Sequence, residues 1–206
     1  MKKKTIIFDL DNTVYSVHSI GKKLFASLFE LIFKNGNHTE NIDKIKDEIM
    51  RRPFQVVAKD YHFSEELTQK GIALLKELAY RGKIEPYPDY QFAKDLPLDK
   101  FLVTTGFLKL QQSKVDGMKI GQDFTEIVIV DPSTSDRTKK DVFADIMKRH
   151  GYNKSEVLVV GDDLQSEIKA AFDLNIAAVL YDRHNFYCNA SDVNSIQSFK
   201  ELVKFI

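Results

Sequence analysis

Two acidic residues stand two positions apart, directly after an apolar run near the start of the chain. The run 6–8 leads into Asp9 and Asp11, so both carboxylates are expected at the carboxyl end of a buried strand. Two unit charges ~4 Å apart repel by about 4 kcal/mol at an effective dielectric constant of about 20. A hard divalent cation such as Mg²⁺ would offset this repulsion. An Asx-turn or a helix N-cap explains an isolated pair equally well.

Further polar groups occur where other parallel strands would end or the next helix would begin. They are Thr104, Thr105 and Gly106 after the second apolar run, Lys139 and Lys140 ahead of a helical stretch, and Asp162, Asp163 and Glu167 after the fourth run. Taken singly, Thr104 could cap a turn, Lys139 could be a solvated lysine and Asp163 could be an N-cap. Because parallel strands present their carboxyl ends at one edge, we expect these groups to share one site with Asp9.

Five short apolar runs predict the strands that position these groups. They are rich in Val, Ile and Leu without polar alternation, as in a sheet covered on both faces: Thr5–Phe8, Phe101–Val103, Ile127–Val130, Val157–Val160 and Ile176–Leu180. Helical stretches separate the later runs. One has its apolar stripe at Val142, Phe143, Ile146 and Met147 and ends at Gly151. This alternation predicts an α/β fold with a doubly wound parallel sheet.

A long helical insertion follows the first predicted strand. Roughly 85 residues without a convincing strand separate the first run from the second, far more than a usual connection. Their apolar positions recur at helical spacing, including Leu24 to Phe33 and Leu67 to Leu78, which predicts core packing within a small bundle. We therefore divide the chain into an α/β core (1–15 and 87–206) and a helical insertion (16–86). An insertion at this point lies above the carboxyl edge of the sheet, as a lid would.

The composition excludes several classes of protein. Thirty Lys and Arg balance thirty Asp and Glu, which argues against a nucleic-acid binder that works by a bulk positive field. A hydrophobic content of 43% and a charged content of 29% are typical of a globular protein. The single cysteine, Cys188, excludes a disulfide framework and fits a reducing compartment. The apolar run behind the N-terminal lysines is too short for a signal peptide or a membrane span. We therefore expect a cytoplasmic protein without a membrane partner.

The sequence resembles the haloacid-dehalogenase-like (HAD) hydrolase superfamily, whose four motifs are matched in order. The matching segments are Asp9-Leu10-Asp11-Asn12-Thr13, Val103-Thr104, Lys139 and Gly161-Asp162-Asp163. The similarity spans the α/β core almost end to end, and the insertion stands where the family has its C1-type helical cap. The resemblance implies a HAD-like Rossmannoid core with an inserted all-helical cap, and a phosphatase activity.

Carried over position by position, the resemblance implies a role for each motif residue. Asp9 is the nucleophile that forms an aspartyl-phosphate. Asp11 protonates the leaving alkoxide and then takes a proton from water. Mg²⁺ is held by the Asp9 carboxylate, the Asp11 main-chain carbonyl and Asp162. Thr104 and Lys139 stabilise the phosphoryl group.

Other assignments around these motifs are less direct. Thr105 and Gly106 are expected beside the phosphate, and Asp163 and Glu167 outside the metal ligands, with Glu167 ordering a metal-bound water. Lys140 is an alternative to Lys139, which has the better spacing to Phe143. Finally, Arg51 and Arg52 form the most cationic spot of the insertion. They could meet an anionic substrate group or be a solvated pair near a helix end.

These expectations favour a Mg²⁺-dependent phosphomonoester hydrolase acting on a small phosphorylated metabolite, with a nucleotide or a sugar phosphate as candidates. A phosphomutase of the β-phosphoglucomutase type uses the same residues and stays an alternative. A true dehalogenase is disfavoured because such enzymes lack the acid that Asp11 supplies. A non-catalytic module that binds a phospho-ligand is disfavoured because Asp9, Asp11 and Lys139 are all present.

Overall fold

The structure is a computed structural model that describes residues 2–187 and 193–206, so Cys188 lies outside the described residues. Within these ranges six parallel strands form one sheet in the order β3-β2-β1-β4-β5-β6. The strands are β1 (Thr5–Phe8), β2 (Asp99–Thr105), β3 (Glu126–Val130), β4 (Val157–Gly161), β5 (Ala177–Tyr181) and β6 (Ser195–Ile196). The predicted α/β fold with a parallel sheet is confirmed.

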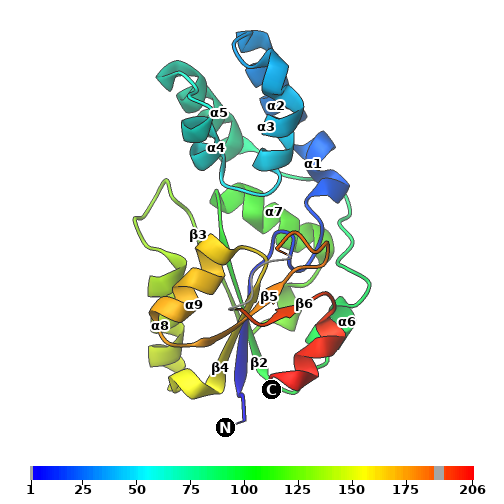
Figure 1. Cartoon of the computed structure of the whole chain (residues 1–206), viewed down its shortest axis with the longest axis vertical. Helices are drawn as coiled ribbons and strands as arrows, with labels where there is room; N and C mark the ends of the chain where they lie inside the picture. The colour runs from blue at the N-terminus through cyan, green and yellow to red at the C-terminus, as the bar shows by residue number, and fades with distance from the viewer. Residues whose placement is uncertain (1, 188–192) are drawn as a thin grey trace.

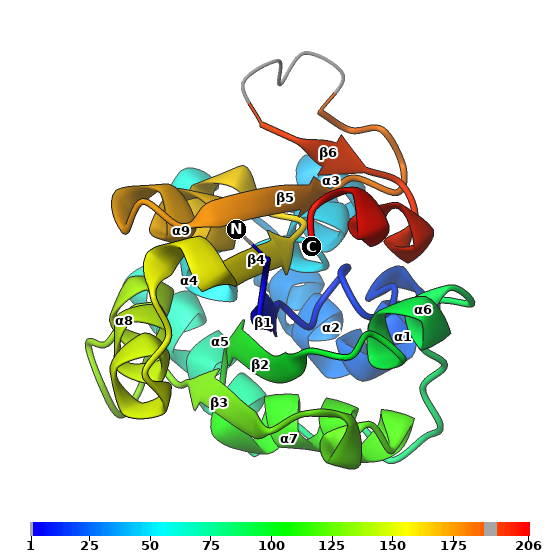
Figure 2. The same ribbon diagram turned by 90° about the horizontal axis from the view of Figure 1, so that it is seen from below.

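Helices cover both faces of the sheet. Figure 2 shows α8 (Lys139–His150) and α9 (Lys169–Asp173) on one side, and α6 (Tyr90–Lys94) and α7 (Leu108–Met118) on the other. Successive residues of β1 point to opposite faces, so Ile7 packs in the core below α8 while Ile6 and Phe8 pack in the core on the α7 side. Two buried faces explain why the strands read as continuous apolar runs.

Five helices fill the predicted insertion. They are α1 (His18–Leu24), α2 (Ala26–Asn35), α3 (Ile42–Ile49), α4 (Phe54–Asp60) and α5 (Glu65–Glu77), with a 3₁₀ turn at Thr39–Asn41. They lie above the carboxyl ends of the strands (Figure 1). Leu28, Ile32 and Leu75 are buried among them. The prediction was wrong for Phe33, which lies in the last turn of α2 and is 57% exposed.

The two chain segments that join these helices to the sheet run side by side. The main-chain N–H of Tyr87 donates to the carbonyl of Val14 over 2.8 Å. Asp89, just after this segment, accepts hydrogen bonds from the Phe199 N–H (2.9 Å), the Ser198 hydroxyl (2.8 Å) and the Arg183 guanidinium (2.9 Å). The exit from the inserted helices is therefore fastened to the C-terminal part of the chain. Among the described residues, no helix has both the length and the apolarity that a bilayer crossing needs.

Candidate active site

The loop after β1 carries the two acidic residues of the first motif. Asp9 still belongs to the sheet, since its N–H donates to the Val160 carbonyl of β4 over 2.9 Å. The chain then turns at Asn12, whose φ of 57° is left-handed, a conformation that Asn tolerates better than most residues. The Asn12 side chain accepts from the Val17 N–H (3.1 Å) and donates to the Met50 carbonyl (3.2 Å). These bonds fix the loop against the inserted helices.

Lys139 reaches this loop from the first turn of α8. A capping box between Thr138 and Asp141 fixes where that helix begins. The Lys139 ammonium lies 2.6 Å from Asp9 Oδ1 and 2.7 Å from Glu167 Oε2, with its side chain only 8% exposed. Lys140 points elsewhere, because its ammonium lies 4.0 Å from Asp173 and its side chain is 48% exposed. Of the two adjacent lysines, Lys139 is therefore the one in the site.

Three carboxylates surround this lysine. Asp9, Asp162 and Glu167 each offer an oxygen, and these three oxygens lie within 4.8 Å of one another. Glu167 stands in a π-helical turn, Leu164–Ile168, and packs directly on Gly161, where a Cβ would lie 2.1 Å from Glu167 Cγ. Only glycine leaves room for this side chain. The structure thus brings Glu167 into the acidic cluster itself, next to Asp9 and Asp162.

The charges of this cluster do not balance. Burial raises the pKa of Asp9 to about 7, even though Lys139 opposes the shift. Burial and the neighbouring Glu167 and Asp9 carboxylates raise the pKa of Asp162 well above its ordinary value. Burial acts in the same direction on Glu167, but Lys139 outweighs it and lowers the pKa of that carboxyl. One ammonium therefore serves three acids.

A divalent cation fits this excess of negative charge. The available donors are carboxylate oxygens, which are the ligands that Mg²⁺ prefers. Zn²⁺ prefers nitrogen and sulfur ligands. Lys139 donates to Glu167 Oε2 and to Asp9 Oδ1, and the Asp163 N–H donates to Glu167 Oε1. Asp162 and the other oxygen of Asp9 would therefore hold the ion. The donor set is the observation that makes Mg²⁺ compatible with the site.

Asp11 is held by a second set of side chains. The Lys114 ammonium contacts both carboxylate oxygens at 2.7 and 2.9 Å, the Tyr15 hydroxyl donates over 2.7 Å and Gln111 Nε2 donates over 3.0 Å. Burial alone would raise the pKa of Asp11, but Lys114 and these hydrogen bonds more than offset it and lower that pKa. Asp11 is therefore an ionised carboxylate paired with a lysine that is 3% exposed.

Sequence reasoning missed Lys114 and Gln111. Both come from α7, which covers one face of the sheet, and both are buried. The available signal was their position on that helix, since Gln111 and Lys114 share the stripe of Leu110, Val115 and Met118. Polar residues on an otherwise apolar stripe need a buried partner. Here that partner is Asp11.

The end of β2 contributes a hydroxyl beside this pair. Thr104 is buried, and its Oγ1 accepts from Gln111 Nε2 over 2.7 Å, while the Thr105 carbonyl accepts from the same nitrogen over 3.2 Å. Gly106 has a φ of 153°, and a Cβ there would lie 2.9 Å from Gln111 Cγ. The Gly106 N–H donates to the Val130 carbonyl over 3.1 Å. This N–H is therefore engaged with β3, while Gly106 itself lines the same cavity as Asp9.

The remaining predicted residues line the same cavity as Asp9 but have other partners. Asp163 Oδ1 accepts from the Gln165 N–H over 2.8 Å and so caps the following turn. Arg52 forms ion pairs with Glu48 (2.5 Å) and Asp60 (2.8 Å). The Arg51 guanidinium stacks on Phe186, 4.1 Å from the ring centroid.

Four separate segments of the α/β core thus place Asp9, Thr104, Lys139 and Asp162 around a single cavity. A model of the haloacid dehalogenase-like hydrolase family matches residues 3–175. The chain belongs to this family. The match covers the sheet from β1 to the segment before β5 and includes all of the inserted helices. The family identity agrees with the resemblance of the four motifs.

Known proteins similar to this HAD-like hydrolase were found by sequence and by structure. A glyceraldehyde 3-phosphate phosphatase of Methanopyrus kandleri is 23% identical, over 82% of this chain and 79% of that protein. YfnB of Bacillus subtilis, a HAD hydrolase solved bound to magnesium, superimposes with a TM-score of 0.67 at 18% identity, over 99% of this chain and 98% of that one. A HAD phosphatase of Thermococcus onnurineus gives a TM-score of 0.64 at 18% identity, over 98% and 96%. The two structures share the whole fold, inserted helices included.

Proposed function

We propose that this HAD-like hydrolase is a Mg²⁺-dependent phosphatase that hydrolyses a small phosphomonoester through an aspartyl-phosphate on Asp9. The observation that carries the proposal is the placement of Asp9, whose Oδ1 lies 2.6 Å from Lys139 in a buried cluster with Asp162 and Glu167. The name of the Methanopyrus kandleri relative supports phosphomonoester hydrolysis. The family and the two carboxylates of the first motif support the covalent route.

In this mechanism Asp9 attacks the phosphorus atom, and the bond from phosphorus to the ester oxygen breaks. Lys139 holds Asp9 in position and supplies positive charge next to the phosphoryl oxygens. The Thr104 hydroxyl faces the same cavity and orients the phosphoryl group. When bound, Mg²⁺ neutralises the negative charge shared by the phosphate and the carboxylates.

The leaving alkoxide needs a proton, which we assign to Asp11 and Lys114 acting as one unit. Together the two side chains carry one proton more than a carboxylate and a neutral amine would. The Lys114 nitrogen lies 2.7 and 2.9 Å from the two Asp11 oxygens. The unit gives that proton to the alkoxide and recovers it from the water that then attacks the phosphorus of the aspartyl-phosphate. Asp9 is released as a carboxylate, and inorganic phosphate leaves.

The proposal is tested by assaying phenyl phosphate hydrolysis before and after removal of divalent cations. We expect turnover with Mg²⁺, a loss of about a hundredfold or more on chelation and full recovery when Mg²⁺ is restored, since a catalytic metal contributes several kcal/mol to the transition state. Folding is monitored by circular dichroism in both states. Turnover that is indifferent to chelation, or the absence of turnover with any phosphomonoester, would contradict the proposal.

A further inference from the structure

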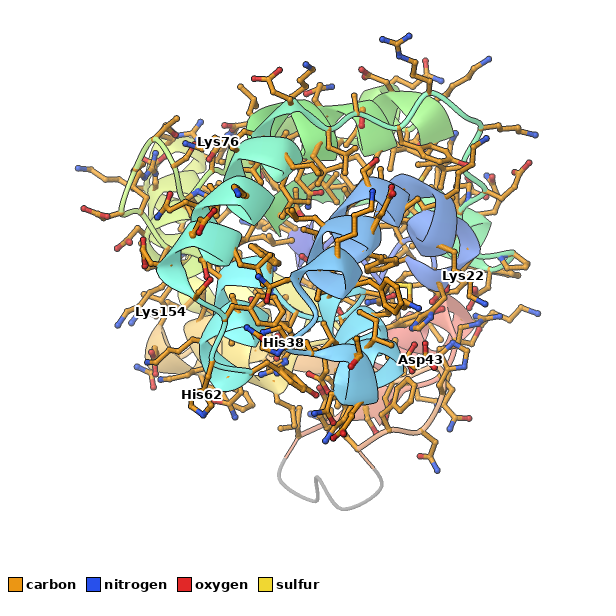
Figure 3. All side chains as sticks on the ribbon, turned by 90° about the horizontal axis from the view of Figure 1, so that it is seen from above. Lys22, His38, Asp43, His62, Lys76 and Lys154 are labelled. Carbon is orange, nitrogen blue, oxygen red and sulfur yellow. The ribbon has the colours of Figure 1, made fainter. Side chains whose placement is uncertain are left out.

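The cavity above Asp9 is small and its outer wall is apolar. Its volume is about 140 Å³, and Asp9, Lys139 and Asp162 lie at its inner end. The wall towards the inserted helices is formed by buried side chains, among them Phe25, Ile49, Met50, Phe54, Leu75 and, from the core, Phe107. Seen from above, the helices cover this edge of the sheet, with charged side chains such as Lys22, Asp43 and Lys76 around their outside (Figure 3).

The two arginines of this wall already have partners within the protein. Arg52 is held by Glu48 and Asp60, and Arg51 is stacked on Phe186. A substrate with a second anionic group would therefore have to displace Glu48 or Asp60 in order to pair with Arg52. A hydroxyl-rich group would also lose hydrogen bonds to water against an apolar wall, which is unfavourable.

We propose that the organic group of the substrate is apolar and no larger than about one benzene ring. The proposal rests on the proposed function, because it concerns the far side of the same phosphate site. An engineered cavity of about 150 Å³ lined by Leu, Ile and Phe takes up one benzene molecule. The cavity here offers about 140 Å³ to the phosphoryl group and the organic group together, with the phosphoryl group at its polar inner end and the organic group against the apolar wall. A nucleoside or a hexose exceeds that volume, so this inference removes the nucleotide and sugar phosphates from the candidates.

Two matched pairs of substrates test polarity and size separately. Propyl phosphate and glycerol 1-phosphate share a three-carbon primary alkyl group and differ in two hydroxyls. Phenyl phosphate and 1-naphthyl phosphate are both aryl esters and differ in one fused ring. With Mg²⁺ present, we expect kcat/KM to favour propyl over glycerol phosphate, and phenyl over naphthyl phosphate, each by about tenfold or more.

A pair of leucine variants on α5 links this preference to the cavity. Leu75 lines the cavity, whereas Leu67 is equally buried on the same helix and does not line it. Leu75→Ala should raise the ratio of naphthyl to phenyl turnover about tenfold, because the missing side-chain atoms leave room for the second ring. Leu67→Ala should keep the wild-type ratio. A ratio measured on one preparation does not depend on the amount of folded enzyme.

The outcomes separate this inference from the proposed function. Equal or better turnover of glycerol and naphthyl phosphates, still dependent on Mg²⁺ and Asp9, overturns the inference and leaves the phosphatase proposal standing. If the ratio of naphthyl to phenyl turnover does not change in Leu75→Ala, or changes equally in Leu67→Ala, the wall that contains Leu75 does not limit the size of the organic group. If none of the four esters is hydrolysed in a Mg²⁺- and Asp9-dependent way, the proposed function itself fails and the inference falls with it.

Discussion

Replacing Asp9 with Asn is expected to lower kcat for phenyl phosphate by about four to six powers of ten, the effect of removing a nucleophile. An amide is a poor nucleophile, so the proposed aspartyl-phosphate should no longer form. The substitution keeps the shape of the side chain and the main-chain bond to Val160. The folded protein should therefore be recovered, and kcat should be measured at saturating Mg²⁺.

The matched control is Asp95→Asn. Asp95 is exposed just after α6 and accepts a hydrogen bond from Gln91. It precedes the amino end of β2, opposite the carboxyl edge that carries the site. Activity of this variant should equal that of the wild type. If Asp9→Asn keeps more than about one hundredth of the wild-type kcat, Asp9 is not the nucleophile.

Replacing Asp11 with Asn should lower kcat by about two to four powers of ten, the usual contribution of acid–base catalysis. The amide cannot exchange a proton with the leaving alkoxide or with water. Lys114→Met should lower kcat by about ten- to a hundredfold, because Asp11 keeps Tyr15 and Gln111 but loses its cationic partner. KM should change little in either variant, since neither Asp11 nor Lys114 is assigned a contact with the phosphoryl group.

Asp116→Asn on the same helix, α7, is the control for both variants. Its side chain is exposed and accepts from Gln112, so kcat should not change. An Asp11→Asn variant within about threefold of the wild type would exclude Asp11 from proton transfer. A Lys114→Met variant that raises KM without lowering kcat would indicate a substrate-binding role for Lys114 instead.

Much of the fold could be predicted from the sequence because each strand is buried on both faces. Continuous runs such as Thr5–Phe8 and Val157–Val160 mark the strands directly. The sixth strand was missed because Ser195–Ile196 has only two residues and no apolar run. The helix after the fourth run also departs from a regular stripe. Phe172 follows the buried Ile168 at helical spacing but is 47% exposed, and a π-helical turn precedes this helix, α9.

The site residues that follow the ends of strands could be predicted, whereas those that are placed by the packing of a helix on the sheet could not. Asp9, Thr104 and Asp162 each follow an apolar run, so a parallel sheet brings them together. Lys114 and Gln111 lie in the middle of α7, and only the packing of that helix on the sheet turns them towards Asp11. The pairing of Arg52 with Glu48 has the i,i+4 spacing of a helix, but its pairing with Asp60 depends on how α3 and α4 meet. Spacing along the sequence does not encode the angle between these two helices.

The central claim is that Asp9 and Asp162 together hold a divalent cation, and it predicts how stability depends on pH. A carboxyl whose pKa is raised in the folded protein stabilises the fold fully below its ordinary pKa, and this stabilisation is lost as pH rises through the raised value, about 7 for Asp9. Asp162 shifts in the same direction. The metal-free protein should therefore lose stability through these two groups as the pH rises from 5.5 to 8. Mg²⁺ binds the ionised carboxylates and should stabilise the fold most at the higher pH.

The deciding measurement is the melting temperature with and without Mg²⁺ at the two pH values, for the wild type and for Asp162→Asn. At a hundredfold excess over Kd, Mg²⁺ should stabilise the wild type at pH 8 by about 2.7 kcal/mol, or about 5–10 °C for a chain of this length, and clearly less at pH 5.5. Asp162→Asn should melt higher than the wild type without metal, because one buried repulsion is removed, and should gain little from Mg²⁺. A wild type that gains nothing from Mg²⁺ at pH 8, or an Asp162→Asn variant that gains as much as the wild type, would contradict the account.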